Sequence, residues 1–158
     1  MFNILLIGSG NIGSRHLQGI IKSKIPFNIY IVEKSKKAII LTKKRIKEIS
    51  KKKEKIFFFN NFNFTNVKFD LLICATNSNK RYELLRKVIS YYQFKYILIE
   101  KVVFQNLKYF EKILKILYKN KIKSWVNCPR REQTIYINIK NKIKFSNNLS
   151  IKISGKKW

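Results

Sequence analysis

The chain has little of what metal sites, disulfide frameworks and membrane spans are built from. Its 158 residues include one histidine and two cysteines, Cys74 and Cys128, and neither cysteine belongs to a C-x-x-C pair. We therefore expect no metal ion and no disulfide framework, which favours a reducing, cytoplasmic location. No run approaches the ~18 apolar residues that a membrane-spanning helix requires, and the apolar run 4–7 is too short for a signal peptide.

Acidic residues are also scarce. Asp and Glu number 8 against 35 Lys and Arg, which gives a formal net charge of +27. A chain of this charge attracts polyanions, so a nucleic acid is one candidate partner. Lysine is, however, spread along the whole sequence rather than gathered in one patch, and no zinc finger, helix-turn-helix or RNA-binding aromatic motif is visible. The composition favours solvated lysine surfaces over a nucleic-acid interface.

What the sequence does contain is an alternation of short apolar runs and helix-spaced apolar residues. With 46% hydrophobic residues, the chain can bury a core. Six runs predict strands, at residues 3–7, 28–32, 56–59, 71–75, 96–99 and 124–126. We therefore predict an α/β fold, a Rossmann-type doubly wound parallel sheet of about six strands in the order 3-2-1-4-5-6.

Two lysine- and isoleucine-rich segments are harder to assign. The lysine-rich stretch 43–55 keeps an apolar stripe, and we predict a helix there. In the tail, every second residue from Ile135 to Ile139 is an isoleucine, as in a strand, while the spacing of the neighbouring residues also suits a helix. Residues 149–153 predict a final strand.

A glycine motif directly follows the first predicted strand and opens a helix. It has the pattern G-x-G-x-x-G and consists of Gly8, Ser9, Gly10, Asn11, Ile12 and Gly13. Gly8 permits the tight turn, Gly10 lets a pyrophosphate approach the backbone, and Gly13 lets the helix pack on the sheet. The helix N-terminus offers free N–H groups to the phosphates. This context predicts a dinucleotide-binding βαβ unit.

Glu33 ends the second predicted strand, 20 residues past Gly13, where an acidic ribose ligand is expected. Its carboxylate would accept hydrogen bonds from both ribose hydroxyls and repel a 2′-phosphate, which favours NAD. The cluster Lys34, Lys36 and Lys37 follows at once and would attract a 2′-phosphate, so NADP stays open. A P-loop is excluded because no Gly-Lys-Ser/Thr follows the glycines.

Three stretches together carry a family resemblance. The glycine motif continues into Ser14, Arg15 and His16, residues 70–78 run Asp-Leu-Leu-Ile-Cys-Ala-Thr-Asn-Ser, and the fifth strand ends in 99–101, Ile-Glu-Lys. In this order and spacing they resemble the Gfo/Idh/MocA oxidoreductases, which include glucose-fructose oxidoreductase and inositol dehydrogenase. The resemblance covers roughly residues 1–130.

The resemblance implies roles for particular residues. Lys101 would contact substrate near the hydride-transfer position, where it could polarise or orient a hydroxyl of a sugar or cyclitol. Glu100 would line the cofactor site at the carboxyl edge of the sheet. His16 is more typical of packing or hydrogen bonding than of catalysis. The residues expected beside the nicotinamide half of the cofactor are Ala75, Thr76 and Asn77.

The resemblance also implies two domains. Residues 1–128 would form the dinucleotide-binding domain, and residues 129–158 would form a linker and the opening strand of a C-terminal substrate domain. Because family members continue through that domain, we expect a shortened or interrupted protein with weak or no turnover by itself. The main interpretation is an NAD(P)-dependent oxidoreductase acting on CH–OH groups. The alternative is a non-catalytic dinucleotide-binding module or a partner-completed subunit. The expected partners include a second copy of the chain, in a homo-oligomer, or a completing subunit.

Overall fold

The computed structural model describes residues 1–23, 25–49, 55–64 and 67–143. The chain divides into two compact units, Met1–Asn127 and Cys128–Trp158. The elements of the first unit are β1 (Phe2–Ile7), α1 (Asn11–Lys22), β2 (Phe27–Val32), α2 (Lys36–Lys47), β3 (Lys55–Phe59), β4 (Leu71–Cys74), α3 (Arg81–Tyr91), β5 (Tyr96–Glu100), α4 (Leu107–Lys119) and β6 (Lys123–Asn127). Those of the second are a 3₁₀ turn, η1 (Pro129–Glu132), and α5 (Thr134–Lys142).

The six strands form one sheet in the order β3-β2-β1-β4-β5-β6, and every neighbouring pair is parallel. The predicted α/β fold and strand order are confirmed. Ile7 at the end of β1 pairs with Val32 of β2 on one side and with Cys74 of β4 on the other. From β1 the strands are added toward one edge of the sheet as β2 and β3, and then toward the other edge as β4, β5 and β6. The strand order therefore reverses between β1 and β4, which is where ligands bind in doubly wound folds.

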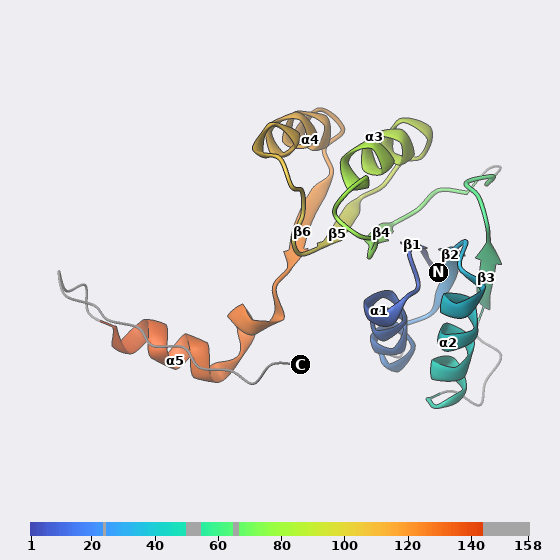
Figure 1. The fold of residues 1–158 in the computed structure, drawn as a ribbon, viewed down its shortest axis with the longest axis horizontal. Helices are drawn as coiled ribbons and strands as arrows, with labels where there is room; N and C mark the ends of the chain where they lie inside the picture. The colour runs from blue at the N-terminus through green and yellow to red at the C-terminus, as the bar shows by residue number, and fades with distance from the viewer. Residues whose placement is uncertain (24, 50–54, 65–66, 144–158) are drawn as a thin grey trace. The chain divides into compact units, whose positions relative to one another are not determined.

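Helices cover the sheet on both faces, as Figure 1 shows, with α1 and α2 on one side and α3 and α4 on the other. Central strands buried on both faces must be apolar throughout, which explains the short continuous apolar runs of β1, β4 and β5. Side chains of alternating strand residues accordingly enter two cores. One contains Leu5, Leu72, Ile97, Leu85 and Leu117, and the other contains Leu6, Ile29, Ile73 and Leu17.

Two expectations about the lysine- and isoleucine-rich segments are now resolved. The helix expected over 43–55 is confirmed only as far as Lys47, where α2 ends, and it is wrong at Lys55, which pairs with Asn28 in the sheet. At Lys55, lateral pairing with β2 outweighs the helical pattern. Residues 50–54 lie outside the described part of the chain. In the tail, residues 134–142 are helical rather than extended. The strand expected at 149–153 lies outside the described residues.

None of the helices in the described part of the chain is both long and apolar enough to span a bilayer.

Candidate functional site

The residues singled out in the sequence lie at one edge of the sheet. They follow the carboxyl ends of β1, β2, β4 and β5, which parallel pairing brings to the same side. The residues are Gly8, Ser9, Gly10, Asn11, Ile12 and Gly13 after β1, Glu33 after β2, Ala75, Thr76 and Asn77 after β4, and Glu100 and Lys101 at the end of β5.

The three glycines of the loop meet different surroundings. Gly8 has a φ of +82°, in the left-handed region that favours glycine. A Cβ on Gly13 would lie 1.9 Å from the carbonyl oxygen of Gly8, so α1 starts in direct contact with the loop. A Cβ on Gly10 would have nothing within 4 Å, so this glycine borders open space. Gly8 and Gly13 are therefore required by the fold itself, whereas Gly10 leaves room for a ligand.

Ser9 is held by hydrogen bonds from both sides. Its N–H donates to Oε2 of Glu33 over 2.8 Å, and its carbonyl accepts from Oγ1 of Thr42 on α2 over 2.6 Å. The other oxygen of Glu33 accepts from the N–H of Ser35, also over 2.8 Å. Each carboxylate oxygen keeps lone-pair capacity for a further donor. Glu33 and Thr42 thus fix the backbone of the glycine loop.

The start of α1 differs from that of α2 and α4. Ser35 caps α2 by accepting from the N–H of Ala38, and Asn106 caps α4 by accepting from the N–H of Lys108. At α1 the N-cap is Gly10, and no side chain caps it. Its first N–H groups therefore stay available to an anion, with the positive end of the helix dipole behind them. This arrangement fits the phosphates of a dinucleotide.

Glu100 is already engaged by two side chains from other elements. Its Oε1 lies 2.6 Å from Nε2 of His16 on α1 and 2.5 Å from Nδ2 of Asn127 on β6. A single carboxylate oxygen therefore lies within hydrogen-bond distance of a side chain on α1 and of a side chain on β6. His16 thus hydrogen-bonds across the site, and Glu100 joins α1, β5 and β6. Lys101, next in sequence, is exposed, and its peptide bond to Val102 is cis.

The loop after β4 begins beside the glycine loop. The N–H of Ala75 donates to the carbonyl of Ile7 over 2.9 Å, and Ala75 also lies next to the Cβ direction of Gly8. Thr76 and Asn77 border a hollow of about 440 Å³ that reaches the start of α3. Beneath them, burial raises the pKa of the Cys74 thiol, which stays protonated and serves as a core residue.

Arg81, the first residue of α3, was missed in the sequence. Its side chain is buried, with 2% of its surface exposed, and its guanidinium donates to backbone carbonyls of the loops after β4 and β5. Among 35 basic residues it does not stand out. A cation in the first turn of a helix opposes the helix dipole, but lysines also lie in the first turn of α2 and of α4, so the sequence carried no signal that sets Arg81 apart.

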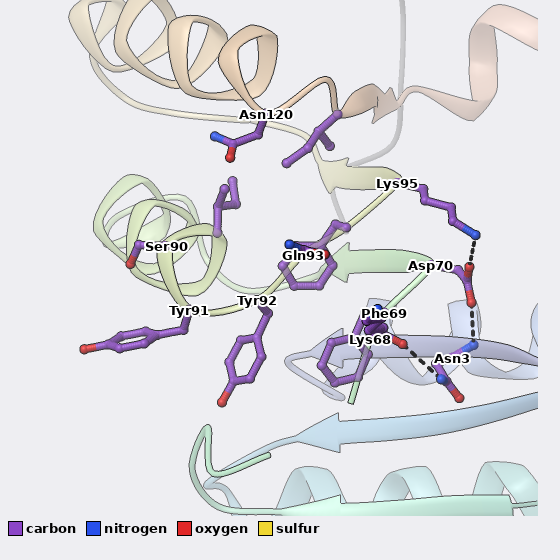
Figure 2. Close-up of a pocket in the computed structure, with 13 residues that line it drawn as sticks. Asn3, Lys68, Phe69, Asp70, Ser90, Tyr91, Tyr92, Gln93, Lys95 and Asn120 are labelled. Atoms are coloured by element: carbon purple, nitrogen blue, oxygen red, sulfur yellow. Dashed lines mark hydrogen bonds and ion pairs between the residues drawn. The ribbon is translucent and has the colours of Figure 1, made fainter. Parts of the chain in front are cut away.

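A second hollow, of about 670 Å³, lies at the opposite edge of the sheet (Figure 2). There the carboxylate of Asp70 accepts from Nζ of Lys95 over 2.8 Å and from the N–H of Asn3 over 3.0 Å. These bonds hold together the amino ends of β1, β4 and β5. The polar groups of Asp70 are thus already paired within the protein, which is typical of a structural tie.

No protein-family model and no curated protein matches the sequence. Solved structures do match. The dehydrogenase WlbA from Chromobacterium violaceum, solved with NADH and UDP-GlcNAcA, superposes with a TM-score of 0.70 at 16% identity, over 89% of this chain and 39% of that one. An NAD-binding protein from Listeria innocua gives 0.66 at 16%, over 89% and 39%.

A third structure, of a protein assigned as an NADPH-dependent oxidoreductase from Desulfitobacterium hafniense, gives 0.66 at 14% identity, over 90% of this chain and 39% of that one. At these identities the likeness establishes the fold alone. The chain has a Rossmann-type fold like that of these three proteins, and it spans 39% of the length of each of them.

Proposed function

We propose that this chain binds a nicotinamide dinucleotide at its glycine loop, as the nucleotide-binding part of an oxidoreductase. One observation carries the proposal. Helix α1 begins after Gly10 without a side-chain cap, and a Cβ on Gly10 would meet nothing within 4 Å. The carboxylate of Glu33 accepts a hydrogen bond from the N–H of Ser9, the residue before Gly10. Open space, free N–H groups and a nearby carboxylate are together what a pyrophosphate and its adjoining ribose require.

The residues have separate parts in this proposal. The N–H groups at the start of α1 hold the pyrophosphate, and Gly10 lets it approach the backbone. Glu33 accepts hydrogen bonds from the ribose hydroxyls with the lone pairs that Ser9 and Ser35 leave free. The loops after β4 and β5 line the nicotinamide half of the dinucleotide. The residues that do so are Ala75, Thr76, Asn77 and Glu100.

The bound dinucleotide would supply a hydride donor or acceptor. Lys101 is the residue we propose for the substrate side, because it is exposed at the same edge of the sheet. Its ammonium would hydrogen-bond and orient a hydroxyl of the substrate, for which we propose a sugar or cyclitol on the Gfo/Idh/MocA resemblance. On the same resemblance we assign residues 1–128 to the nucleotide domain and 129–158 to the beginning of a substrate domain.

NAD is the preferred cofactor in this proposal. The carboxylate of Glu33 is fixed by two backbone N–H groups, so a 2′-phosphate would meet a negative charge that cannot easily turn away. Lys34, Lys36 and Lys37 are all exposed around it and supply the opposing attraction. The affinity ratio between NADH and NADPH measures which charge dominates.

Calorimetric titration of the purified chain with NADH and NADPH tests the proposal. We expect micromolar binding, tighter for NADH, which Gly10→Asp abolishes because its carboxylate enters the space left for the pyrophosphate. Gly19→Asp is the matched control, since it adds the same carboxylate on the same helix, at a glycine that also has nothing within 4 Å. Unchanged circular dichroism would show that both variants fold. Binding that survives Gly10→Asp, or a folded wild-type chain that binds neither nucleotide, would refute the proposal.

A further inference from the structure

Arg81 joins the two loops that border the proposed nicotinamide side of the site. Its Nη1 lies 2.5 Å from the carbonyl oxygens of Glu100 and Val102 and 3.1 Å from that of Val103, so its two hydrogens are shared among three acceptors. Its Nη2 donates to the carbonyl of Thr76. One guanidinium therefore holds the loop after β5 at three points and the loop after β4 at a fourth.

The bonded carbonyls lie on both sides of Lys101. Glu100 precedes this lysine and Val102 follows it, so the backbone is tied before and after a residue whose own side chain is exposed. A flexible loop would let the Lys101 ammonium sweep through a wide volume. With both neighbours fixed, the direction in which the side chain leaves the backbone is set.

The charge of Arg81 is held mainly by the backbone of the two loops. The residue is 2% exposed, and the hydrogen bonds of its guanidinium go to backbone carbonyls. The Glu100 carboxylate and the Cys74 sulfur lie near enough to favour its charged form as well. Burial lowers the pKa of the guanidinium, although an arginine side chain remains charged in proteins. Its Nε has no partner within the described residues. Burying a cation costs free energy unless hydrogen bonds compensate for the lost hydration, and here the loop carbonyls provide those bonds.

Arginine suits this task because its planar fork can bond two separate segments at once. Lysine would bring the same charge, but its three donors share one nitrogen, so they reach less widely separated acceptors than the two terminal nitrogens of arginine do. The neighbouring carboxylate of Glu100 is held from the far side by His16 and Asn127, so the β5 end is fixed from α1, α3 and β6 together.

We propose that Arg81 is a positioning residue, which locks the loop carrying Lys101 against the loop carrying Thr76 and Asn77 as one preformed surface for the nicotinamide half of the dinucleotide. This inference rests on the proposed function for its ligand. The fixing of the loops themselves does not depend on any ligand.

Amide hydrogen exchange on the unliganded chain tests the fixing of the loops. In Arg81→Met we expect faster exchange at 76–79 and 101–104, with β1 and β2 unchanged. Arg81→Lys should give an intermediate increase, and it serves as the second variant if the methionine variant does not fold. Arg86→Met, an exposed arginine on the same helix, is the matched control and should exchange like the wild type. Unchanged loops, or equal acceleration throughout the sheet, would overturn the inference.

Titration with NADH and with ADP-ribose, which lacks the nicotinamide, tests whether the fixed loops form a binding surface for the nicotinamide half. We expect Arg81→Lys to weaken NADH binding about tenfold while ADP-ribose binding stays within about twofold of the wild type. An equal loss for both ligands would mean that Arg81 only stabilises the fold, and would overturn its positioning role. A wild-type chain that binds ADP-ribose as tightly as NADH would do the same. Failure to bind either ligand would instead refute the proposed function, while the exchange measurement would still decide whether Arg81 fixes the loops.

Discussion

Gly13 and Gly10 belong to the same motif, but close packing leaves no room for a side chain at Gly13, whereas Gly10 borders open space. A Cβ on Gly13 would lie 1.9 Å from the Gly8 carbonyl oxygen, which is backbone and cannot move aside as a flexible side chain could. We predict that Gly13→Ala destabilises the fold by about 3 kcal/mol or more, because α1 must shift away from the loop. Chemical denaturation followed by circular dichroism measures the change.

Gly10→Ala is the matched comparison at the residue scale. Gly10 has a φ of −63°, which any residue adopts, and open space around its Cβ direction. Its alanine variant should therefore unfold at nearly the wild-type denaturant concentration. Equal stability of the Gly13 and Gly10 variants would show that the close contact at Gly13 does not constrain the helix.

Single residues were predictable from the sequence only where spacing carries the information. Gly8, Gly13 and Glu33 are separated by intervals that the βαβ unit itself dictates, so their place at one edge of the sheet followed from the pattern. The roles of Thr42 and Arg81 depend on which loops meet in space. Local sequence has no signal for the bond from Thr42 to the Ser9 carbonyl, because residues 33 positions apart meet only after the sheet forms.

At the scale of elements, strands were predictable because each central strand is apolar on both faces. Helix ends were less so. The lysine-rich stretch 43–55 predicted a single helix, and the alternation in the tail fitted both a strand and a helix, so local period alone did not fix where these elements lie. Lys55 joins the sheet because β2 offers it a partner, whereas residues 134–142 form a helix.

The tie at the amino ends of β1, β4 and β5 predicts a pH dependence of stability. Hydrogen bonds from Lys95 and from the backbone N–H of Asn3 hold the pKa of Asp70 below its usual 3.8. A lowered pKa in the folded state gives stability that is present above the unfolded value and is lost as the pH falls through the folded value. We predict that the difference in free energy of unfolding between the wild type and Asp70→Asn is constant above about pH 5 and shrinks below about pH 4.

Urea denaturation of both proteins from neutral pH to about pH 3 measures this difference. Glu111→Gln, on the exposed side of α4, is a control for losing a carboxylate elsewhere. A difference that stays constant down to pH 3 would mean that Asp70 titrates alike in the folded and unfolded chains.

At the scale of the whole molecule, the formal charge of +27 acts on stability through self-repulsion. Salt screens repulsion between charges beyond a Debye length, about 10 Å at 0.1 M. We predict that raising sodium chloride from about 20 mM to about 500 mM increases the free energy of unfolding by about 1–2 kcal/mol. Denaturation in urea, which adds no charge of its own, measures it.

Sodium and potassium chloride should act alike in this experiment, because screening depends on ionic strength. A decrease in stability with salt would show that favourable ion pairs outweigh the repulsion. Steeply salt-dependent binding to arbitrary DNA, with no binding of NADH, would favour the nucleic-acid interpretation instead.

The central position of β1 beside β4 bears on when the site comes into being during synthesis. Gly8 leaves the ribosome before Ala75, which follows β4, and before Lys101, which follows β5. At roughly 5–20 residues per second, several seconds pass between the synthesis of the glycine loop and that of the loops after β4 and β5, which complete the site. Pairing across such a sequence separation is also the slow part of folding. Dinucleotide affinity should therefore appear late, so a cofactor would secure a completed sheet rather than guide its assembly.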